Sequence, residues 1–181
     1  MNRHLRATRL ARWNVSFLIF LSAFLACDSR PDRTPSNFIL IRADHRVLGT
    51  SVYPIAVDPQ KVGTFPADTH SGAGYFYDDV LEYRVWLNPK NGAQTLNGSG
   101  DYYVAFAQYE PAKQFSESAA GAESPIVLVR QLEWINESEH GHFIPEKEER
   151  ITEWQVRWLA GNKRGPNSIQ DFLKHPREEG P

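Results

Sequence analysis

Cysteine, methionine and long apolar runs are scarce in this sequence. One cysteine and one methionine occur in 181 residues, so the chain can form no internal disulfide. No run reaches the roughly 18 apolar residues of a membrane-spanning helix, which excludes a protein of several membrane spans. The chain also lacks a large excess of charge of either sign. The 20 lysines and arginines stand against 22 aspartates and glutamates, a balance that argues against nucleic-acid binding.

Motifs of several enzyme classes are also missing. The chain has no G-x-S-x-G elbow of a serine hydrolase, no phosphate-binding P-loop and no H-E-x-x-H zinc motif. What it does have is 41% hydrophobic and 12% aromatic residues, enough for one folded core. These counts predict one globular domain and leave its activity open.

The first 27 residues have the pattern of a bacterial lipoprotein signal peptide. Four arginines precede a largely apolar stretch of 12 residues, from Val15 to Ala26. A basic region, a short apolar region and a small residue before a cleavage site are typical of secretory signals. The only cysteine, Cys27, follows directly, at the position where a lipoprotein signal requires a thiol that takes the lipid.

This resemblance predicts a signal peptide over 1–26 and a polar, lipid-anchored tether over 27–37, held at the bacterial cell envelope. In the usual lipoprotein signal, Leu, a small residue and then Ala or Gly precede the cysteine. Here Phe24 and Leu25 occupy the first two of these positions. Three alternatives therefore remain: an ordinary signal peptide, a signal anchor, or a misassigned start codon that leaves the protein cytoplasmic. Without the four leader arginines, 16 basic and 22 acidic groups remain, a net charge of −6. Attachment would then depend on the lipid rather than on charge.

Alternating apolar and polar residues predict a β-rich domain over 38–174. Residues Tyr75–Leu87 and Arg150–Leu159 alternate with period 2, which is typical of strands. The apolar continuity of Pro125–Ile135 predicts a strand buried on both faces. Residues Asn136–Glu149 are expected to form a charged loop.

Two short helices complete the predicted domain. One begins at Glu110–Pro111 and ends before Gly121, and the other covers Ile169–Lys174. We expect an α+β fold with a mostly antiparallel sheet of four or five strands and two short helices. Residues 175–181 are polar and expected to form a flexible tail.

The segment Thr69–Asp79 (THSGAGYFYDD) is the leading candidate for a site. Its glycines allow backbone N–H groups to approach a ligand, and His70 can act as an acid or base near neutral pH. Asp78 and Asp79 are adjacent, so only one of them faces a given site. A solvated glycine loop that enters a strand explains the same residues.

Two further sets of polar residues allow a functional or a structural explanation. Glu82 and Arg84 share one face of a strand, where they form a surface ion pair or flank a bound anion or amide. His140 and His142, with glutamates nearby, have the composition of a metal-binding loop. A zinc site needs three or four ligands, however, and loop histidines without a metal fit equally well.

Aromatic residues are concentrated in the predicted domain. Either they line a ligand groove, or they form a small core of large rings. The set comprises Tyr75, Tyr77, Tyr83, Trp86, Tyr102, Tyr103, Tyr109, Trp134, Trp154 and Trp158.

Four segments suggest a wider resemblance: TSVYPIAVDPQKVGTFPADTHSGAGYFYDDVLEYRVW, YYVAFAQYEPAKQFSESAAGAESPIVLV, ERITEW and NSIQDFL. They resemble a group of small bacterial proteins that often carry the label of GNAT-type N-acetyltransferases. That label implies binding of acetyl-CoA through Arg/Gln-x-x-Gly-x-Gly/Ala. The nearest stretch, Gln94–Gly100, has its first glycine one position late, so no motif residue is carried over.

An analogy of fold adds a second transferase hypothesis. Some ADP-ribosyltransferases place a histidine, a tyrosine and a glutamate around NAD, and His70, Tyr77 and Glu153 can supply these groups. We expect an envelope protein with a small-molecule- or protein-binding domain, with a small transferase as the alternative. Convergence of His70, Arg84 and Glu153 with Asp78 or Asp79 in one cleft would favour the enzyme. The sequence assigns no cofactor and no partner besides the membrane.

Overall fold

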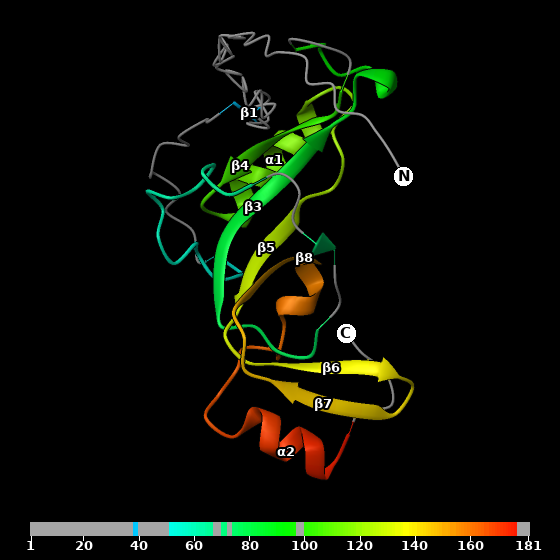
Figure 1. Cartoon of the computed structure of the whole chain (residues 1–181). Helices are drawn as coiled ribbons and strands as arrows, with labels where there is room; N and C mark the ends of the chain where they lie inside the picture. The colour runs from blue at the N-terminus through cyan, green and yellow to red at the C-terminus, as the bar shows by residue number, and fades with distance from the viewer. Residues whose placement is uncertain (1–37, 40–50, 67–69, 72–73, 97–99, 177–181) are drawn as a thin grey trace, which may run out of the picture. The chain divides into compact units, whose positions relative to one another are not determined.

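The computed structural model describes residues 38–39, 51–66, 70–71, 74–96 and 100–176, and for 38–39 and 70–71 only the backbone (Figure 1). The predicted leader over 1–26 and tether over 27–37 lie outside these residues, as do 177–181 of the predicted tail. The described residues belong to one compact unit, Thr34–Pro181. None of the helices in the described ranges is long and apolar enough to cross a membrane.

A six-stranded sheet forms the centre of this unit, in the order β1-β4-β3-β5-β8-β2. Its long strands pair antiparallel throughout, and the two-residue strands β1 and β2 pair parallel at the edges. The predicted α+β class with a mostly antiparallel sheet is therefore confirmed. The strands are β1 (Phe38–Ile39), β2 (His70–Ser71), β3 (Asp79–Leu87), β4 (Tyr102–Phe106), β5 (Ile126–Gln131) and β8 (Arg150–Gln155).

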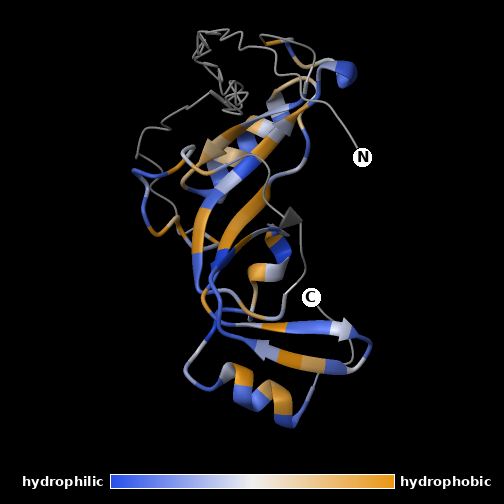
Figure 2. Ribbon diagram, in the orientation of Figure 1, coloured by the Kyte–Doolittle hydropathy of each residue, from blue (hydrophilic) through white to orange (hydrophobic). Residues whose placement is uncertain are grey.

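The central strand β5 is apolar because both of its faces are covered. Val127, Leu128 and Val129 are all fully buried, as the continuous apolar run predicts. Much of β3 and β5 is coloured as hydrophobic in Figure 2, whereas polar colours dominate the hairpin that follows. Most of the aromatic residues also lie in the core, which favours the structural explanation of their number.

Both predicted helices are present. In α1 (Tyr109–Ser118), Ala112 is fully buried and Phe115 contacts Phe106 on β4, with 5.4 Å between ring centroids. In α2 (Ser168–Lys174), Ile169 and Phe172 are buried in a separate apolar cluster. Two short 3-10 helices, η1 (Pro89–Asn91) and η2 (Val156–Leu159), complete the helical elements of the described residues.

The charged segment after β5 is a hairpin, so the predicted loop over 136–149 is wrong. Strands β6 (Trp134–Glu139) and β7 (His142–Glu146) pair antiparallel through a turn at Gly141, whose φ is 77°. Ile135 is the one fully buried residue of these two strands, so exposed charged residues obscure the alternation in the sequence. The predicted strand over 125–135 is correspondingly divided between two sheets.

A bulge in β3 changes which side chains share a face. The register shifts between Val80 and Glu82, so Val80 joins Tyr83 in the main core rather than facing with Glu82. Beyond the bulge the alternation holds. Glu82 and Arg84 therefore project from the opposite face of the sheet, toward segment 51–66.

Candidate functional site

Arg84 on β3 is the centre of a buried ionic network. Its side chain is fully buried, and its Nε donates to Glu82 Oε1 at 2.6 Å. Its Nη1 donates to Glu153 Oε1 on β8 at 2.7 Å. Its Nη2 donates to the carbonyl oxygen of Pro66 at 2.8 Å. One guanidinium therefore joins two strands of the sheet to segment 51–66, whose residues from Ala56 onward cover this face.

The network holds one carboxylate and the guanidinium away from water. Glu82 is also fully buried, and its Oε2 accepts a hydrogen bond from the backbone N–H of Gly63 at 2.6 Å. Burial raises the pKa of Glu82, and the neighbouring Arg84 opposes that rise. Glu153 is different, because 15% of its side chain is exposed. It is the member of the trio that reaches solvent.

Tyr103 on β4 completes the surroundings of Arg84. The guanidinium carbon lies 4.4 Å from the centroid of the Tyr103 ring, a cation–π contact. The Tyr103 hydroxyl donates to the carbonyl oxygen of Phe65 at 2.9 Å, and burial raises the pKa of this phenol. The expectation that Glu82 and Arg84 form a surface pair is therefore wrong, because segment 51–66 covers them.

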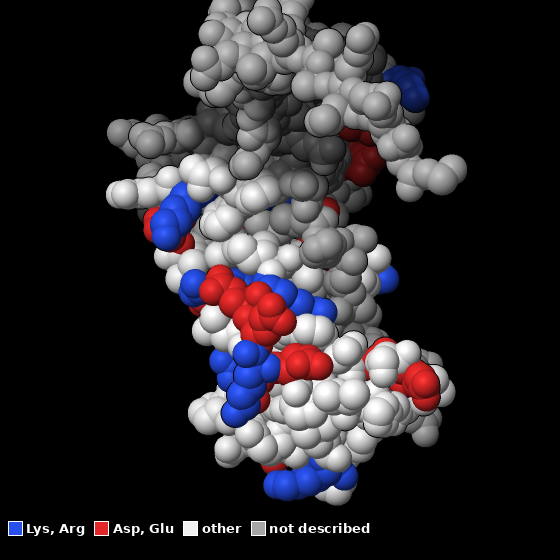
Figure 3. Space-filling model, in the orientation of Figure 1, with Lys and Arg blue, Asp and Glu red and all other residues white. Residues whose placement is uncertain are grey.

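The two aspartates of the predicted site bind elsewhere. Asp78 accepts hydrogen bonds from Arg164 Nε at 2.7 Å and from the backbone N–H of Leu132 at 2.6 Å. Asp79 forms ion pairs with Arg130 and, at 3.7 Å, with Lys163. These contacts hold the C-terminal segment and the start of the hairpin against β3. Both aspartates therefore have a structural role. Figure 3 shows acidic and basic side chains next to one another on the face of the molecule that it presents.

Tyr77 and Glu153 lie on opposite sides of the sheet. Tyr77 is buried against Trp154, with 5.9 Å between ring centroids, and Trp154 follows Glu153 on β8. Successive residues of a strand point to opposite faces. The His70 backbone pairs with Thr152, one residue before Glu153, and its side chain lies outside the description. Of the residues named for an enzyme cleft, Arg84 and Glu153 come together, while Asp78, Asp79 and Tyr77 do not join them.

A second polar network lies where the predicted glycine loop ends. Gln131 is fully buried, its Nε2 donates to the carbonyl of Phe76 at 2.7 Å, and its Oε1 accepts from Arg150 Nε at 2.7 Å. Arg150 lies over the Trp134 ring at 3.8 Å, and burial lowers its pKa. A Cβ at Gly74 would come within 2.6 Å of Gln131 Nε2. Gly74 is therefore explained by close packing rather than by ligand approach. Gly72 lies outside the described residues.

The two histidines predicted as weak metal ligands flank the turn of the hairpin. His140 Nδ1 lies 3.6 Å from Glu137 Oε1, and His142 is the register partner of Glu139. Within the described ranges no group of three or more His, Cys, Asp or Glu residues is placed to hold a metal ion. Glu137 instead accepts a hydrogen bond from Tyr75, and this bond lowers the pKa of Glu137. Burial, together with the same hydrogen bond, raises the pKa of Tyr75 to about 12.

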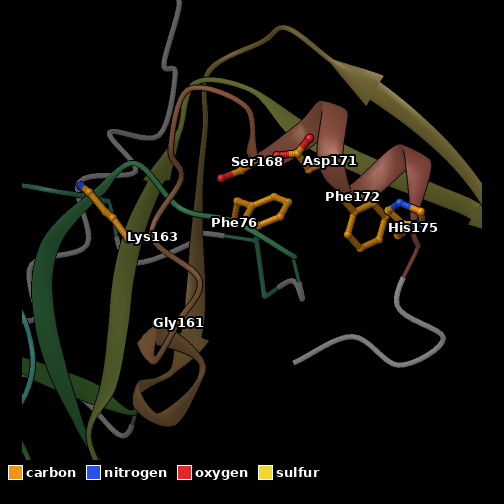
Figure 4. Close-up of a pocket in the computed structure, with 7 residues that line it drawn as sticks. All are labelled: Phe76, Gly161, Lys163, Ser168, Asp171, Phe172 and His175. Atoms are coloured by element: carbon orange, nitrogen blue, oxygen red, sulfur yellow. The ribbon is translucent and has the colours of Figure 1, made fainter.

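A hollow of about 340 Å³ beside α2 is a site that the sequence did not predict. The lining is mostly polar, and Phe76 and Phe172, only 6% and 4% exposed, add small apolar edges to it. In Figure 4, Ser168 and Asp171 project from α2 over the Phe76 ring. The residues that line it are Phe76, Gly161, Lys163, Ser168, Asp171, Phe172 and His175.

Residues far apart in the sequence form this hollow, so no sequence motif predicts it. Phe76 precedes β3, whereas α2 comes more than 90 residues later. The apolar pair Ile169 and Phe172 indicates that α2 packs against something, but not that a space remains beside it. The start of α2 is held by a bond within the preceding turn. Asn167 makes no side-chain cap, and Ser168 Oγ accepts from the N–H of Gly165 at 2.8 Å.

Comparisons with known proteins add no relative. The sequence matches no protein-family model, no curated protein and no solved structure. The resemblances to lipoprotein signals and to proteins with the acetyltransferase label therefore stay predictions.

Proposed function

We propose that this protein is a lipid-anchored protein of the bacterial cell envelope whose folded domain binds a small ligand in the hollow beside α2. The convergence of separate segments on one hollow carries the proposal, with polar side chains around the exposed edges of two largely buried aromatic rings. In small-molecule sites, polar groups that converge on a hollow orient the ligand. A volume of about 340 Å³ suits a small metabolite rather than a protein partner.

The Arg84 network is less suited to bind a ligand. Each of the three guanidinium nitrogens already donates to an oxygen of the protein itself. The Arg84 side chain is also fully buried, so a ligand could reach it only by displacing the residues that cover it. The network therefore fits a structural role, holding segment 51–66 against the sheet.

A small transferase remains the alternative, and one observation favours it. Glu153 is held in place by Arg84 and keeps 15% of its side chain exposed, so its carboxylate can reach a substrate. A carboxylate fixed by an arginine is suited to orient or deprotonate a bound group. Acetyl-CoA or NAD would be the donor that the two resemblances imply.

The ligand proposal predicts which residues respond to binding. We would titrate the full chain with a panel of nucleotides, sugars, amines, acids, acetyl-CoA and NAD, and follow backbone amide signals by NMR. A ligand of the hollow is expected to shift the signals of Gly161, Ser168 and Asp171 most, because these residues line it. The substitution Ser168→Phe, which fills the hollow, is expected to weaken binding by about tenfold or more, equivalent to about 1.4 kcal/mol.

The matched control is Ser118→Phe, an exposed serine near the end of α1. It adds the same ring to the other helix and should leave binding unchanged. Binding that shifts residues around Glu153 instead, with acetyl-CoA or NAD as the ligand, would replace the proposal by the transferase alternative. A panel in which no member shifts the hollow would contradict it.

The envelope proposal is tested at Cys27. In a bacterial host supplied with labelled fatty acid, the full chain is expected to take up label and to sediment with membranes. Cys27→Ser should abolish both, because serine lacks the thiol that carries the lipid. The control Ser29→Ala, two residues further along, should keep both. Labelling that persists in the Cys27→Ser variant would rule out this attachment.

A further inference from the structure

Three of the six exposed large apolar residues in the described ranges come from one short stretch. Val52, Ile55 and Val57 have 82%, 50% and 56% of their surface exposed, and Pro54 between them is exposed too. These four residues form the 52–57 patch. The other three lie after β5, on β7 and on α2: Leu132, Ile144 and Leu173. Single exposed apolar residues are ordinary on a protein surface, whereas a group of them marks a site of interaction.

The backbone that carries the 52–57 patch is held in place by its inward-facing side chains. Tyr53 packs edge to face on Tyr109 at the start of α1, with 4.8 Å between ring centroids. Ala56 is buried, and its N–H donates to the carbonyl oxygen of Ala107, just after β4, at 2.9 Å. The patch belongs to segment 51–66, drawn in cyan in Figure 1. It is therefore an apolar surface on a fastened segment rather than on a frayed end.

Charge does not oppose the burial of this patch. Residues 51–57 (SVYPIAV) contain no charged side chain. Two carboxylates border it, and both have partners. Asp58 pairs with Lys61 at 3.8 Å, and Glu110 accepts a hydrogen bond from the hydroxyl of Ser51 at 2.9 Å. Such a surface can enter the boundary between lipid head groups and acyl chains without burying an unpaired charge.

The tether predicted over 27–37 brings this patch within reach of a membrane. It leads into β1, which pairs with β4 at Phe38 and Tyr103. Ala56 bonds to Ala107, four residues further on, so the patch lies about 13 Å along β4 from the point where the tether meets the sheet. The tether itself spans at most about 40 Å when extended. A linker this short raises the effective concentration of the membrane to about the millimolar range, where a weak contact is enough.

We infer that the 52–57 patch is a second contact between the domain and the bilayer that holds its anchor. Val52, Ile55 and Val57 would enter the boundary between head groups and acyl chains, and the inward contacts of Tyr53 and Ala56 would keep the segment in shape. The contact would fix which face of the domain is turned toward the membrane. This inference goes beyond ligand binding in the hollow, and it rests on the proposed lipid anchor.

A fluorescent label at position 55 tests this contact. In the lipidated protein the only native cysteine, Cys27, carries the lipid, so Ile55→Cys supplies a free thiol. We would attach the fluorophore NBD, reconstitute the protein in vesicles of phosphatidylethanolamine and phosphatidylglycerol, and measure quenching by doxyl groups on the lipid acyl chains. The label at 55 is expected to be quenched at least about twofold more than the same label in Ile144→Cys, an exposed isoleucine of β7.

A double variant tests whether the apolar side chains drive the contact. Val52→Ser/Val57→Ser removes exposed aliphatic groups, so it should leave the fold intact and lower the quenching at 55 at least about twofold. The control Leu132→Ser/Leu173→Ser removes two exposed leucines elsewhere and should leave the quenching unchanged. Vesicles of phosphatidylcholine alone should quench the label equally, because an apolar contact requires no anionic lipid.

The outcomes separate this inference from the proposed anchor. Equal quenching at 55 and 144 would overturn the contact and leave the anchor intact. Emission at 55 that shifts to the blue without quenching by lipid would overturn it as well, because a second copy or another segment of this chain would then cover the patch. Mass spectrometry that finds no lipid on Cys27 would overturn both the anchor and the contact.

Discussion

Arg84→Met is expected to destabilise the folded domain by about 3–5 kcal/mol, as removal of one partner from a buried ion pair does. The reason lies in Glu82, which is fully buried and would lose its compensating charge. Methionine fills a similar volume, so the loss reports charge rather than a cavity. Urea denaturation of the variant and of the wild type measures the difference in free energy of unfolding.

The pH dependence of this loss identifies its cause. Burial already raises the pKa of Glu82 in the folded protein, and removal of Arg84 would raise it further. Below the unfolded glutamate pKa of about 4.3, both states carry the proton and the charge penalty is absent. The destabilisation should therefore be smallest near pH 4 and increase toward pH 7. A loss that does not vary with pH would contradict the electrostatic explanation.

Two comparisons sharpen the Arg84 experiment. The double variant Glu82→Gln/Arg84→Met removes the buried charge but keeps an amide oxygen that can accept from the N–H of Gly63, so it should recover part of the lost stability. Arg157→Met changes an exposed arginine in η2 and should alter stability by less than about 0.5 kcal/mol. A double variant less stable than Arg84→Met alone would argue against an unpaired Glu82 as the source of the loss.

Phe172→Ala is expected to lower the free energy of unfolding of the region where α2 packs by about 3–5 kcal/mol. This is the usual range for loss of a buried phenylalanine. The ring is 4% exposed and contacts Tyr75 and Phe143, with centroids 4.3 and 5.1 Å away. A helix as short as α2, of seven residues, is unstable without such packing. The variant should therefore release α2 and lose the hollow.

Hydrogen exchange shows whether this loss is local. Protection is expected to fall in α2 and in the β6–β7 hairpin, and to persist in β3, β4 and β5, whose core does not include Phe172. The control is Leu173→Ala, the next residue on α2, whose side chain is 37% exposed. Unchanged protection in α2 of the Phe172→Ala variant would show that the helix is held by other contacts.

The helices and central strands follow from local pattern. The alternation in β3, the apolar run of β5 and the proline near the start of α1 each act over a few residues, and each led to the correct element. The hairpin was missed because Ile135 is its one fully buried residue, and exposed charged residues dominate the pattern of its strands. The end of β8 was missed because the period continues into η2 while the backbone leaves the sheet.

The candidate sites were less accessible to sequence reasoning. The sequence placed Glu82 and Arg84 on one face, and they do share one, yet their burial depends on segment 51–66. That segment has no period and no described strand within it. Asp78 and Asp79 were named for a site because carboxylates are chemically versatile. Their actual partners, Arg164 and Arg130, lie 86 and 51 residues away in the chain.

The sequence by itself determined the α+β class, the two helices and the continuous burial of β5, because propensity and periodicity are properties of neighbouring residues. Only the tertiary structure decided which polar groups are buried and where a hollow remains. Burial depends on what covers a face, and a hollow depends on where packing is incomplete between Phe76 and α2. Both are set by segments distant in the chain, whose approach no local pattern records.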